Sequence, residues 1–266
     1  MITAIAVTIA GSDSGGGAGI QADLKTFSAL GVYGASVITA ITAQNTVGVT
    51  GIHDVPPAMI AAQIDAVFAD LAVNAVKIGM LSVPLAIGAV AAGLDRWKQT
   101  NVVLDPVMVA TSGDRLLAPE ATHALARDLF PRALLITPNL HEAAALTDTP
   151  LATNETEMRA QAQALLALGA NAVLIKGGHA QAADATDLLV TRDAIARFTA
   201  EKIDTKNTHG TGCTLSSAIA AELAKGAPLA QAVGDAKAYV TAAIASADEL
   251  TIGHGHGPVH HFHAWW

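Results

Sequence analysis

The chain has 266 residues, of which 52% are hydrophobic and 14% charged, and its formal net charge is −8. This acidic balance, without clustered lysines and arginines, argues against nucleic acid as a partner. The longest apolar run, residues 83–94, is too short and too interrupted by glycine and proline to cross a bilayer, so no membrane partner is expected. The one cysteine, Cys213, excludes an internal disulfide and favours a cytoplasmic location.

Apolar strand-like runs alternate with alanine- and leucine-rich helical stretches along the chain. Buried strands are predicted at 2–10, 35–43, 74–79, 102–107, 134–137 and 172–176, and shorter or more exposed strands at 187–191 and 197–203. Helices are predicted at 19–30, 57–70, 83–98, 119–129, 140–147, 155–168, 213–225 and 228–248. The alternation predicts a mostly parallel sheet with helices on both faces, formed by a single α/β domain over residues 1–266.

In such a sheet the ligand crevice lies beyond the carboxyl ends of the strands. The first predicted strand is followed by residues 11–19, of which five are glycine, and then by a helix that carries Asp23. This loop lacks the Gly-Lys-Ser/Thr of a P-loop. It fits a dinucleotide-binding pattern loosely, but the acidic residue expected about 20 positions later is missing, which argues against NAD.

Two residues after the next strands suit a flat heterocycle. Gln44 offers a donor and an acceptor side by side, which matches a ring nitrogen next to an amino group. The alternative for Gln44 is a role in stabilising a turn with its neighbour Asn45. Met80 offers an adaptable apolar surface for such a ring, and its alternative is an ordinary place in the core.

Charged side chains follow three later strands. Asp105 and Glu142, at neighbouring strand ends, form a candidate Mg²⁺ anchor, although either could instead cap a helix. Lys176 precedes a glycine pair that allows close approach to a phosphate.

The segment 206–213 leads directly into a predicted helix. Gly210 and Gly212 allow close backbone approach, and the first N–H groups of the helix form an anion site. Cys213 lies at the mouth of this site, where the positive helix end is expected to favour the thiolate. We interpret the segment as a phosphoryl-transfer centre; the alternative is a tight turn into a helix with a small buried cysteine.

Six motifs, in order and covering essentially the whole chain, carry a resemblance. They are residues 11–26, 42–46, 77–80, 137–142, 176–179 and 208–213. Together they resemble the hydroxymethylpyrimidine/phosphomethylpyrimidine kinases of thiamine biosynthesis, which belong to the ribokinase-like superfamily. The resemblance implies a three-layer αβα sandwich, a homodimer, and the use of ATP with Mg²⁺ to phosphorylate the pyrimidine alcohol and then its monophosphate.

The resemblance also implies a role for individual positions. Cys213 stands where sugar kinases of the superfamily place an aspartate base, a departure that a loose transition state tolerates. The roles carried over are substrate binding by Gln44, Asp23, Met80 and Val107; ATP binding by Lys176, Thr208, Gly210 and Gly212; catalysis by Cys213, Gly210, Thr211 and Gly212; and magnesium binding by Asp105 and Glu142.

Two other functions remain open at this point. A pyridoxal or pyridoxine kinase shares the fold and this type of glycine-rich centre, and a non-catalytic nucleotide- or vitamer-binding protein would be indifferent to loss of Cys213. Residues 253–266 hold five of the ten histidines, which is compatible with metal binding or an added tag. Because this ending resembles the natural tail of the kinase family, we interpret it as structural.

Overall fold

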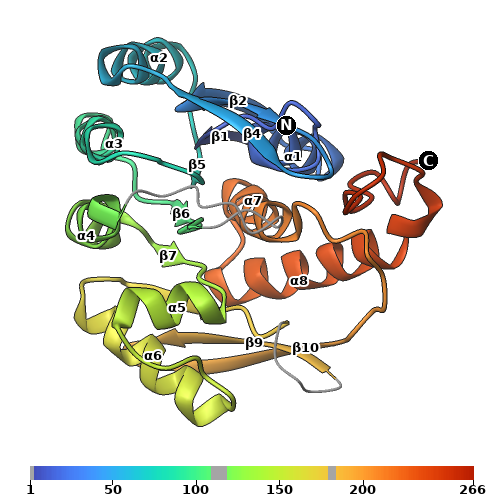
Figure 1. Cartoon of the computed structure of the whole chain (residues 1–266). Helices are drawn as coiled ribbons and strands as arrows, with labels where there is room; N and C mark the ends of the chain where they lie inside the picture. The colour runs from blue at the N-terminus through green and yellow to red at the C-terminus, as the bar shows by residue number, and fades with distance from the viewer. Residues whose placement is uncertain (1–2, 109–118, 179–183) are drawn as a thin grey trace.

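The fold is built on a central sheet enclosed between two layers of helices, as Figure 1 shows for the computed structural model, which describes residues 3–108, 119–178 and 184–266. Within these residues the main sheet has eight strands in the order β10-β9-β8-β7-β6-β5-β1-β2. The strands are β1 (Ile5–Ala10), β2 (Tyr33–Ile38), β5 (Ala75–Ile78), β6 (Val102–Leu104), β7 (Leu135–Ile136), β8 (Ala172–Ile175), β9 (Asp184–Thr191) and β10 (Ile195–Glu201). From β2 to β8 all neighbours are parallel, while β9 and β10 pair antiparallel.

The helices divide between the two faces of the sheet. They are α1 (Gly19–Ala29), α2 (Pro57–Asp70), α3 (Pro84–Arg96), α4 (Pro119–Asp128), α5 (Leu140–Thr147), α6 (Glu155–Ala167), α7 (Thr211–Ala224) and α8 (Leu229–Ala245). Val7 and Ile9 of β1 pack in one core with α2 to α6, whereas Ala6 packs in the other with α1, α7 and α8. Strand side chains point alternately to opposite faces, so one apolar strand supplies both cores. The predicted three-layer αβα sandwich is confirmed.

Local sequence explains where several helices begin. Pro57 and Pro84 occupy the first positions of α2 and α3, where a missing N–H costs nothing. Asn139 caps α5 in a reciprocal capping box with Glu142. Each of these starts was predicted from the sequence to within one residue.

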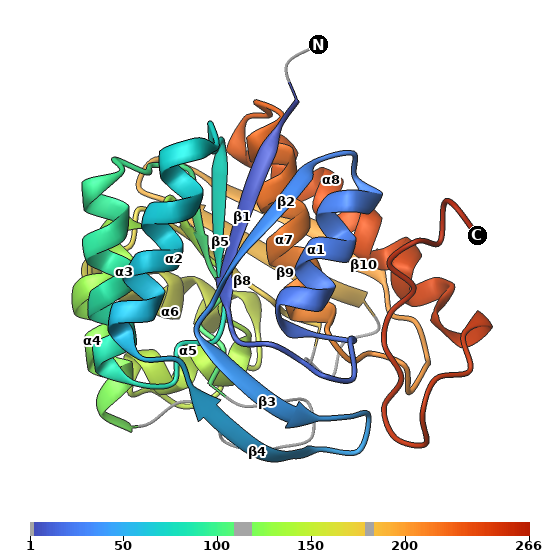
Figure 2. The ribbon, with the colours of Figure 1, turned by 90° about the horizontal axis from the view of Figure 1, so that it is seen from above.

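The strand predicted at residues 35–43 has the wrong boundaries. Residues 35–43 form parts of two strands, because the chain leaves the main sheet after β2 and continues as β3 (Ala40–Gln44). Strand β3 pairs antiparallel with β4 (Val49–Asp54), which the sequence did not predict. Strand β4 is mostly exposed and lacks an apolar run, so its sequence carries no signal of burial. Figure 2 shows this hairpin projecting beyond the carboxyl ends of the parallel strands.

Candidate active site

A buried aspartate organises the glycine-rich loop that follows β1. The Asp13 carboxylate accepts hydrogen bonds from the backbone N–H groups of Gly15 (2.8 Å), Gly17 (3.0 Å) and Ala18 (2.8 Å), and from His209 Nε2 (2.8 Å). Burial alone would raise the pKa of Asp13, but the hydrogen bonds from His209 and the backbone lower it. These N–H groups therefore bind the loop's own aspartate and are not available to a bound phosphate. Sequence reasoning gave Asp13 no role, although an aspartate followed by glycines is typical of such a turn.

Glycines allow this loop to touch the segment that precedes α7. Gly210 has a φ of +81°, and a Cβ there would lie 1.9 Å from the carbonyl oxygen of Gly17. A Cβ on Gly17 would in turn lie 2.5 Å from His209 Cδ2. Side chains at these two positions would separate the loops, so the contact requires glycine on both sides.

The N-terminus of α7 keeps donors available. The N–H of Thr211 is used, because it donates to the carbonyl of Thr208 at 3.2 Å. Among the residues that the structure describes, the N–H groups of Gly212 and Cys213 have no hydrogen-bond acceptor. Thr208, Thr211, Gly212 and Cys213 are all partly exposed. Two available donors at a partly exposed helix end are compatible with the anion site, which stays a prediction.

Cys213 differs from the expectation in its protonation. Burial raises the pKa of its thiol to about 11, against the opposing effects of the Lys77 charge and a hydrogen bond from the backbone of Gly19. The expected thiolate is therefore wrong for the ligand-free chain, because loss of hydration outweighs the positive helix end. The thiol is protonated at neutral pH.

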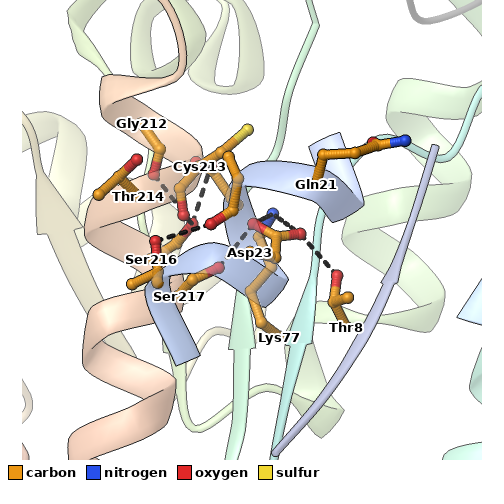
Figure 3. Close-up of polar contacts among 12 residues, drawn as sticks. Thr8, Gln21, Asp23, Lys77, Gly212, Cys213, Thr214, Ser216 and Ser217 are labelled. Atoms are coloured by element: carbon orange, nitrogen blue, oxygen red, sulfur yellow. Dashed lines mark hydrogen bonds and ion pairs between the residues drawn. The ribbon is translucent and has the colours of Figure 1, made fainter. Parts of the chain in front are cut away.

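A fully buried ion pair lies between α1, β1, β5 and α7, as Figure 3 shows. Lys77 Nζ lies 2.8 Å from both carboxylate oxygens of Asp23. Asp23 also accepts hydrogen bonds from Thr8 Oγ1 and Ser217 Oγ, each at 2.6 Å. Burial would lower the pKa of Lys77, but the Asp23 charge raises it. Four elements are thus tied together at the residue that the sequence predicted as a substrate contact.

The buried ion pair bears on the predicted substrate contact of Asp23 and gives Lys77 a structural role. The side chain of Asp23 has no exposed surface, and a direct contact with substrate stays a prediction. Sequence reasoning assigned no role to Lys77, although a lysine inside the apolar run Ala75–Ile78 is itself a signal, because a buried ammonium requires a counter-charge.

The structure brings together the three charged residues predicted at later strand ends. Lys176 Nζ lies 2.8 Å from Asp105 Oδ1 and 3.8 Å from Glu142 Oε2. Thr137 Oγ1 donates a hydrogen bond to Asp105 at 3.1 Å. A Cβ on Gly212 would lie 3.3 Å from Lys176 Nζ and 3.6 Å from Asp105 Oδ2. The charged cluster therefore borders the first turn of α7.

Negative charge is crowded in this cluster. Burial raises the pKa of Glu142 to about 7, and the nearby Asp105 charge adds to the effect against the opposing charge of Lys176. Glu142 Oε2 also accepts the N–H of Asn139 at 2.7 Å as part of the capping box of α5. The helix-cap role and the predicted magnesium role thus fall on the same carboxylate.

The residues predicted to bind the heterocycle lie by the glycine-rich loop or after β6. The backbone N–H of Gln44 donates to Ser14 Oγ at 2.8 Å, and the Ser14 hydroxyl donates to the backbone carbonyl of Gln44 at 2.7 Å. Met80 is buried, and its Cε lies 3.0 Å from the position of a Cβ on Gly11. Val107, after β6, is partly exposed. The structure therefore places Gln44 and Met80 against the same loop.

Comparison with known proteins shows what the whole chain is similar to. A family model described as phosphomethylpyrimidine kinase matches residues 13–260. The chain is 63% identical to the hydroxymethylpyrimidine/phosphomethylpyrimidine kinase of Rhizobium meliloti (strain 1021), over 100% of this chain and 99% of that protein.

Solved structures give the same result. Phosphomethylpyrimidine kinase from Clostridium difficile 630 matches with a TM-score of 0.80 and 47% identity, over 90% of this chain and 99% of that one. An ADP complex of Bacillus subtilis pyridoxal kinase matches with a TM-score of 0.90 and 39% identity, over 98% of both chains. The resemblance inferred from the six motifs is therefore confirmed: the chain belongs to the phosphomethylpyrimidine kinase family.

Proposed function

We propose that the chain is an ATP-dependent kinase that converts 4-amino-5-hydroxymethyl-2-methylpyrimidine to its monophosphate and then to its diphosphate. The observation that carries this proposal is the position of the α7 N-terminus. Its first turn, at Gly212 and Cys213, borders the Asp105–Lys176–Glu142 cluster. An anion site beside a lysine and two carboxylates suits the transfer of a phosphoryl group from a nucleotide. The family to which the chain belongs supports the same reaction.

The acceptor is assigned to the side of the glycine-rich loop. Gln44 hydrogen-bonds the aminopyrimidine edge, and Met80 and Val107 contact the ring. The Gln44 backbone is fixed by two hydrogen bonds with Ser14, which supports a side chain held ready for recognition. Asp23 acts in the same pocket through its link with Lys77, Thr8 and Ser217, which fixes α1 against β5 and α7.

The transfer step is assigned to the start of α7. The backbone N–H groups of Gly210 and Gly212 face the transferring phosphoryl oxygens, as does that of Thr211 once it releases the Thr208 carbonyl, and Cys213 faces the acceptor hydroxyl. The hydroxyl oxygen forms the new bond to phosphorus, the bond from phosphorus to ADP breaks, and the hydroxyl proton leaves for Cys213. Because this thiol is protonated in the ligand-free chain and is partly exposed, it first gives its own proton to solvent water and takes up the hydroxyl proton as the thiolate. A loose transition state needs little basicity before transfer, so positioning dominates.

Nucleotide phosphates are assigned to Lys176 and Thr208, together with Gly210 and Gly212. A magnesium ion fits this end of the site, because Asp105 and Glu142 offer carboxylate oxygens on either side of Lys176. When bound there, it would neutralise charge on the phosphate oxygens. The similarity to a kinase solved with ADP supports ATP as the donor.

We also propose a single domain over residues 1–266, a cytoplasmic location and a homodimer. Both cores pack against the same main sheet, which supports one domain. None of the described helices has the length and apolar character needed to cross a bilayer. Ile41, Val47 and Ile52 of the β3–β4 hairpin are exposed, which supports association of two copies through this element. Sedimentation of the wild type and of Ile41→Ser tests the dimer.

Pyridoxal is the second candidate acceptor, favoured by the fit to the pyridoxal kinase of Bacillus subtilis. The test is ADP release from Mg-ATP with hydroxymethylpyrimidine, its monophosphate and pyridoxal supplied separately at equal concentrations. Turnover with both pyrimidines is expected. Preference for pyridoxal would move the assignment to that activity, and no release with any acceptor would favour the non-catalytic binding protein.

A further inference from the structure

The histidine-rich end of the chain is built into the molecule, which confirms its interpretation as structural. We call residues 253–263 the C-terminal strap. Its first part lies on the turn of the β3–β4 hairpin: Gly255 N donates to Thr46 Oγ1 at 3.2 Å, and His256 N donates to the Thr46 carbonyl at 3.0 Å. A Cβ on Gly253 or Gly255 would lie 2.2 or 2.0 Å from Thr46 atoms. The strap therefore follows this turn at a distance that only glycine permits.

The middle of the strap lies on the segment before α7. His209 N donates to the Gly257 carbonyl at 3.0 Å, and Val259 N donates to the His209 carbonyl at 3.3 Å. Gly257 N also donates to Asn207 Oδ1 at 3.1 Å, and a Cβ on Gly257 would lie 2.2 Å from that oxygen. This part of the strap holds the residue that directly precedes Gly210.

The end of the strap is anchored on two helices. His261 Nε2 lies 3.1 Å from Thr214 Oγ1 in the first turn of α7, and the His261 carbonyl accepts a hydrogen bond from Tyr239 of α8 at 2.6 Å. Burial lowers the pKa of His261 to about 3, so this imidazole is neutral at physiological pH and adds no charge beside Cys213. His260 N donates to the Ala243 carbonyl at 2.9 Å.

The strap is held by hydrogen bonds to other parts of the chain. Among residues 3–108, 119–178 and 184–266, no group of three or more histidine, cysteine or acidic side chains is placed to hold an ion. His260 and His261 are buried, and the strap reaches its neighbours chiefly through backbone hydrogen bonds. Those neighbours are Thr46, two residues from Gln44, and His209, one residue from Gly210.

We propose that the C-terminal strap is a positioning element that fixes the acceptor-binding hairpin relative to the phosphate-binding start of α7. This rests on the proposed function, which places the pyrimidine at Gln44 and the transferring phosphoryl group at Gly210–Gly212. None of the residues assigned above to bind the pyrimidine or the nucleotide belongs to the strap. It acts through Thr46 at one end and through Asn207 and His209 at the other, so the two ends influence different kinetic constants.

The test uses full-length variants and steady-state kinetics. Gly255→Ala places a methyl group against Thr46 and is expected to raise KM for the pyrimidine about tenfold, with kcat and KM for ATP within twofold of wild type. Gly257→Ala places a methyl group against Asn207 and is expected to lower kcat at least tenfold, with KM for the pyrimidine within twofold. His254→Ala is the matched control, because His254 is an exposed strap histidine, and its constants should not change.

A milder pair guards against misfolding of the glycine variants. Thr46→Val removes the hydroxyl that accepts from Gly255 while keeping the shape, and Thr46→Ser keeps the hydroxyl. We expect KM for the pyrimidine to rise in the valine variant and to return towards wild type in the serine variant. Equal KM values in both, or a loss of kcat in all variants that simply tracks the folded fraction, would overturn the proposal.

Amide hydrogen exchange separates this proposal from the proposed function. Gly255→Ala should speed exchange in residues 44–50, and Gly257→Ala should speed it in residues 206–214. If the wild type fails to phosphorylate pyrimidine but these local effects are present, the function is wrong and the positioning role stands. If exchange in both segments matches wild type, the strap does not position them.

Discussion

The Asp13 carboxylate and His209 Nε2 are joined by a hydrogen bond of 2.8 Å across 196 residues of sequence. Asp13 lies in the loop after β1, and His209 lies one residue before the glycine that leads into α7. Because a carboxylate only accepts, His209 donates through Nε2. This bond, together with the contact of Gly17 on Gly210, fixes the glycine-rich loop against the candidate phosphate site.

Replacing Asp13 by alanine should destabilise the fold strongly. The change leaves the buried Gly17 N–H and His209 Nε2 and the less buried N–H groups of Gly15 and Ala18 without their acceptor, for which we expect a loss of about 3–5 kcal/mol in the free energy of unfolding. Urea denaturation measures this, with Asp193→Ala at an exposed aspartate as the control. Equal losses in the two variants would contradict the central role of Asp13.

Removing the charge of Lys77 should destabilise the fold, because Asp23 then stays buried without a counter-charge. Lys77→Met leaves an unpaired buried carboxylate, and we expect a loss of about 3–5 kcal/mol in the free energy of unfolding. The double variant Lys77→Met/Asp23→Asn removes the charge. Its amide oxygen still accepts from one of the Thr8 and Ser217 hydroxyls and its amide NH2 donates to the other, so much of the loss should be recovered. Thermal and chemical denaturation measure the free energy of unfolding of both variants. A double variant no more stable than the single would show that charge pairing is not the cause.

Loss of the Cys213 thiol should impair turnover more than nucleotide binding. If Cys213 takes the hydroxyl proton, Cys213→Ala should lower kcat by roughly 10²- to 10⁴-fold, with the Kd for ATP little changed. Steady-state assays and calorimetric titration with ATP measure the two effects. Cys213→Ser, which retains a polar hydrogen, should lose less. Wild-type turnover in the alanine variant would remove Cys213 from the reaction.

The raised pKa of Cys213 predicts slow alkylation at neutral pH. Only the thiolate reacts with iodoacetamide, so the rate should rise about tenfold for each pH unit between pH 7 and 10, below a pKa of about 11. Mass spectrometry follows this reaction without ambiguity, because the chain has one cysteine. A rate that levels off below pH 8 would show that Cys213 is a thiolate near neutral pH, as the position of the helix end led us to expect.

Gln44 should affect substrate binding more than the chemical step. Gln44→Ala removes one or two hydrogen bonds to the aminopyrimidine edge, each worth about 1 kcal/mol, so KM should rise roughly 5- to 30-fold with kcat nearly unchanged. Kinetics with varied hydroxymethylpyrimidine at saturating ATP give both constants. An unchanged KM would place the pyrimidine elsewhere.

The sequence by itself determined the family, the three-layer architecture and the outlines of most strands and helices. Apolar runs such as those of β1, β5 and β8 are buried on both faces, and proline or asparagine marks the starts of α2, α3 and α5; these signals are local. The order of the loops along the chain also allowed Asp105 and Glu142 to be paired and Lys176 to be expected in the same crevice, because parallel strands end at one edge of a sheet.

Only the tertiary structure decided how charges and loops pair across the chain. The Asp23–Lys77 pair, the Asp13–His209 bond and the contact of Gly255 in the strap with Thr46 join residues 54, 196 and 209 positions apart, and local patterns hold no information about such partners. The protonation of Cys213 was wrong for a related reason. The position of a helix end is visible in the sequence, but the burial that removes water from the thiol is set by segments distant along the chain.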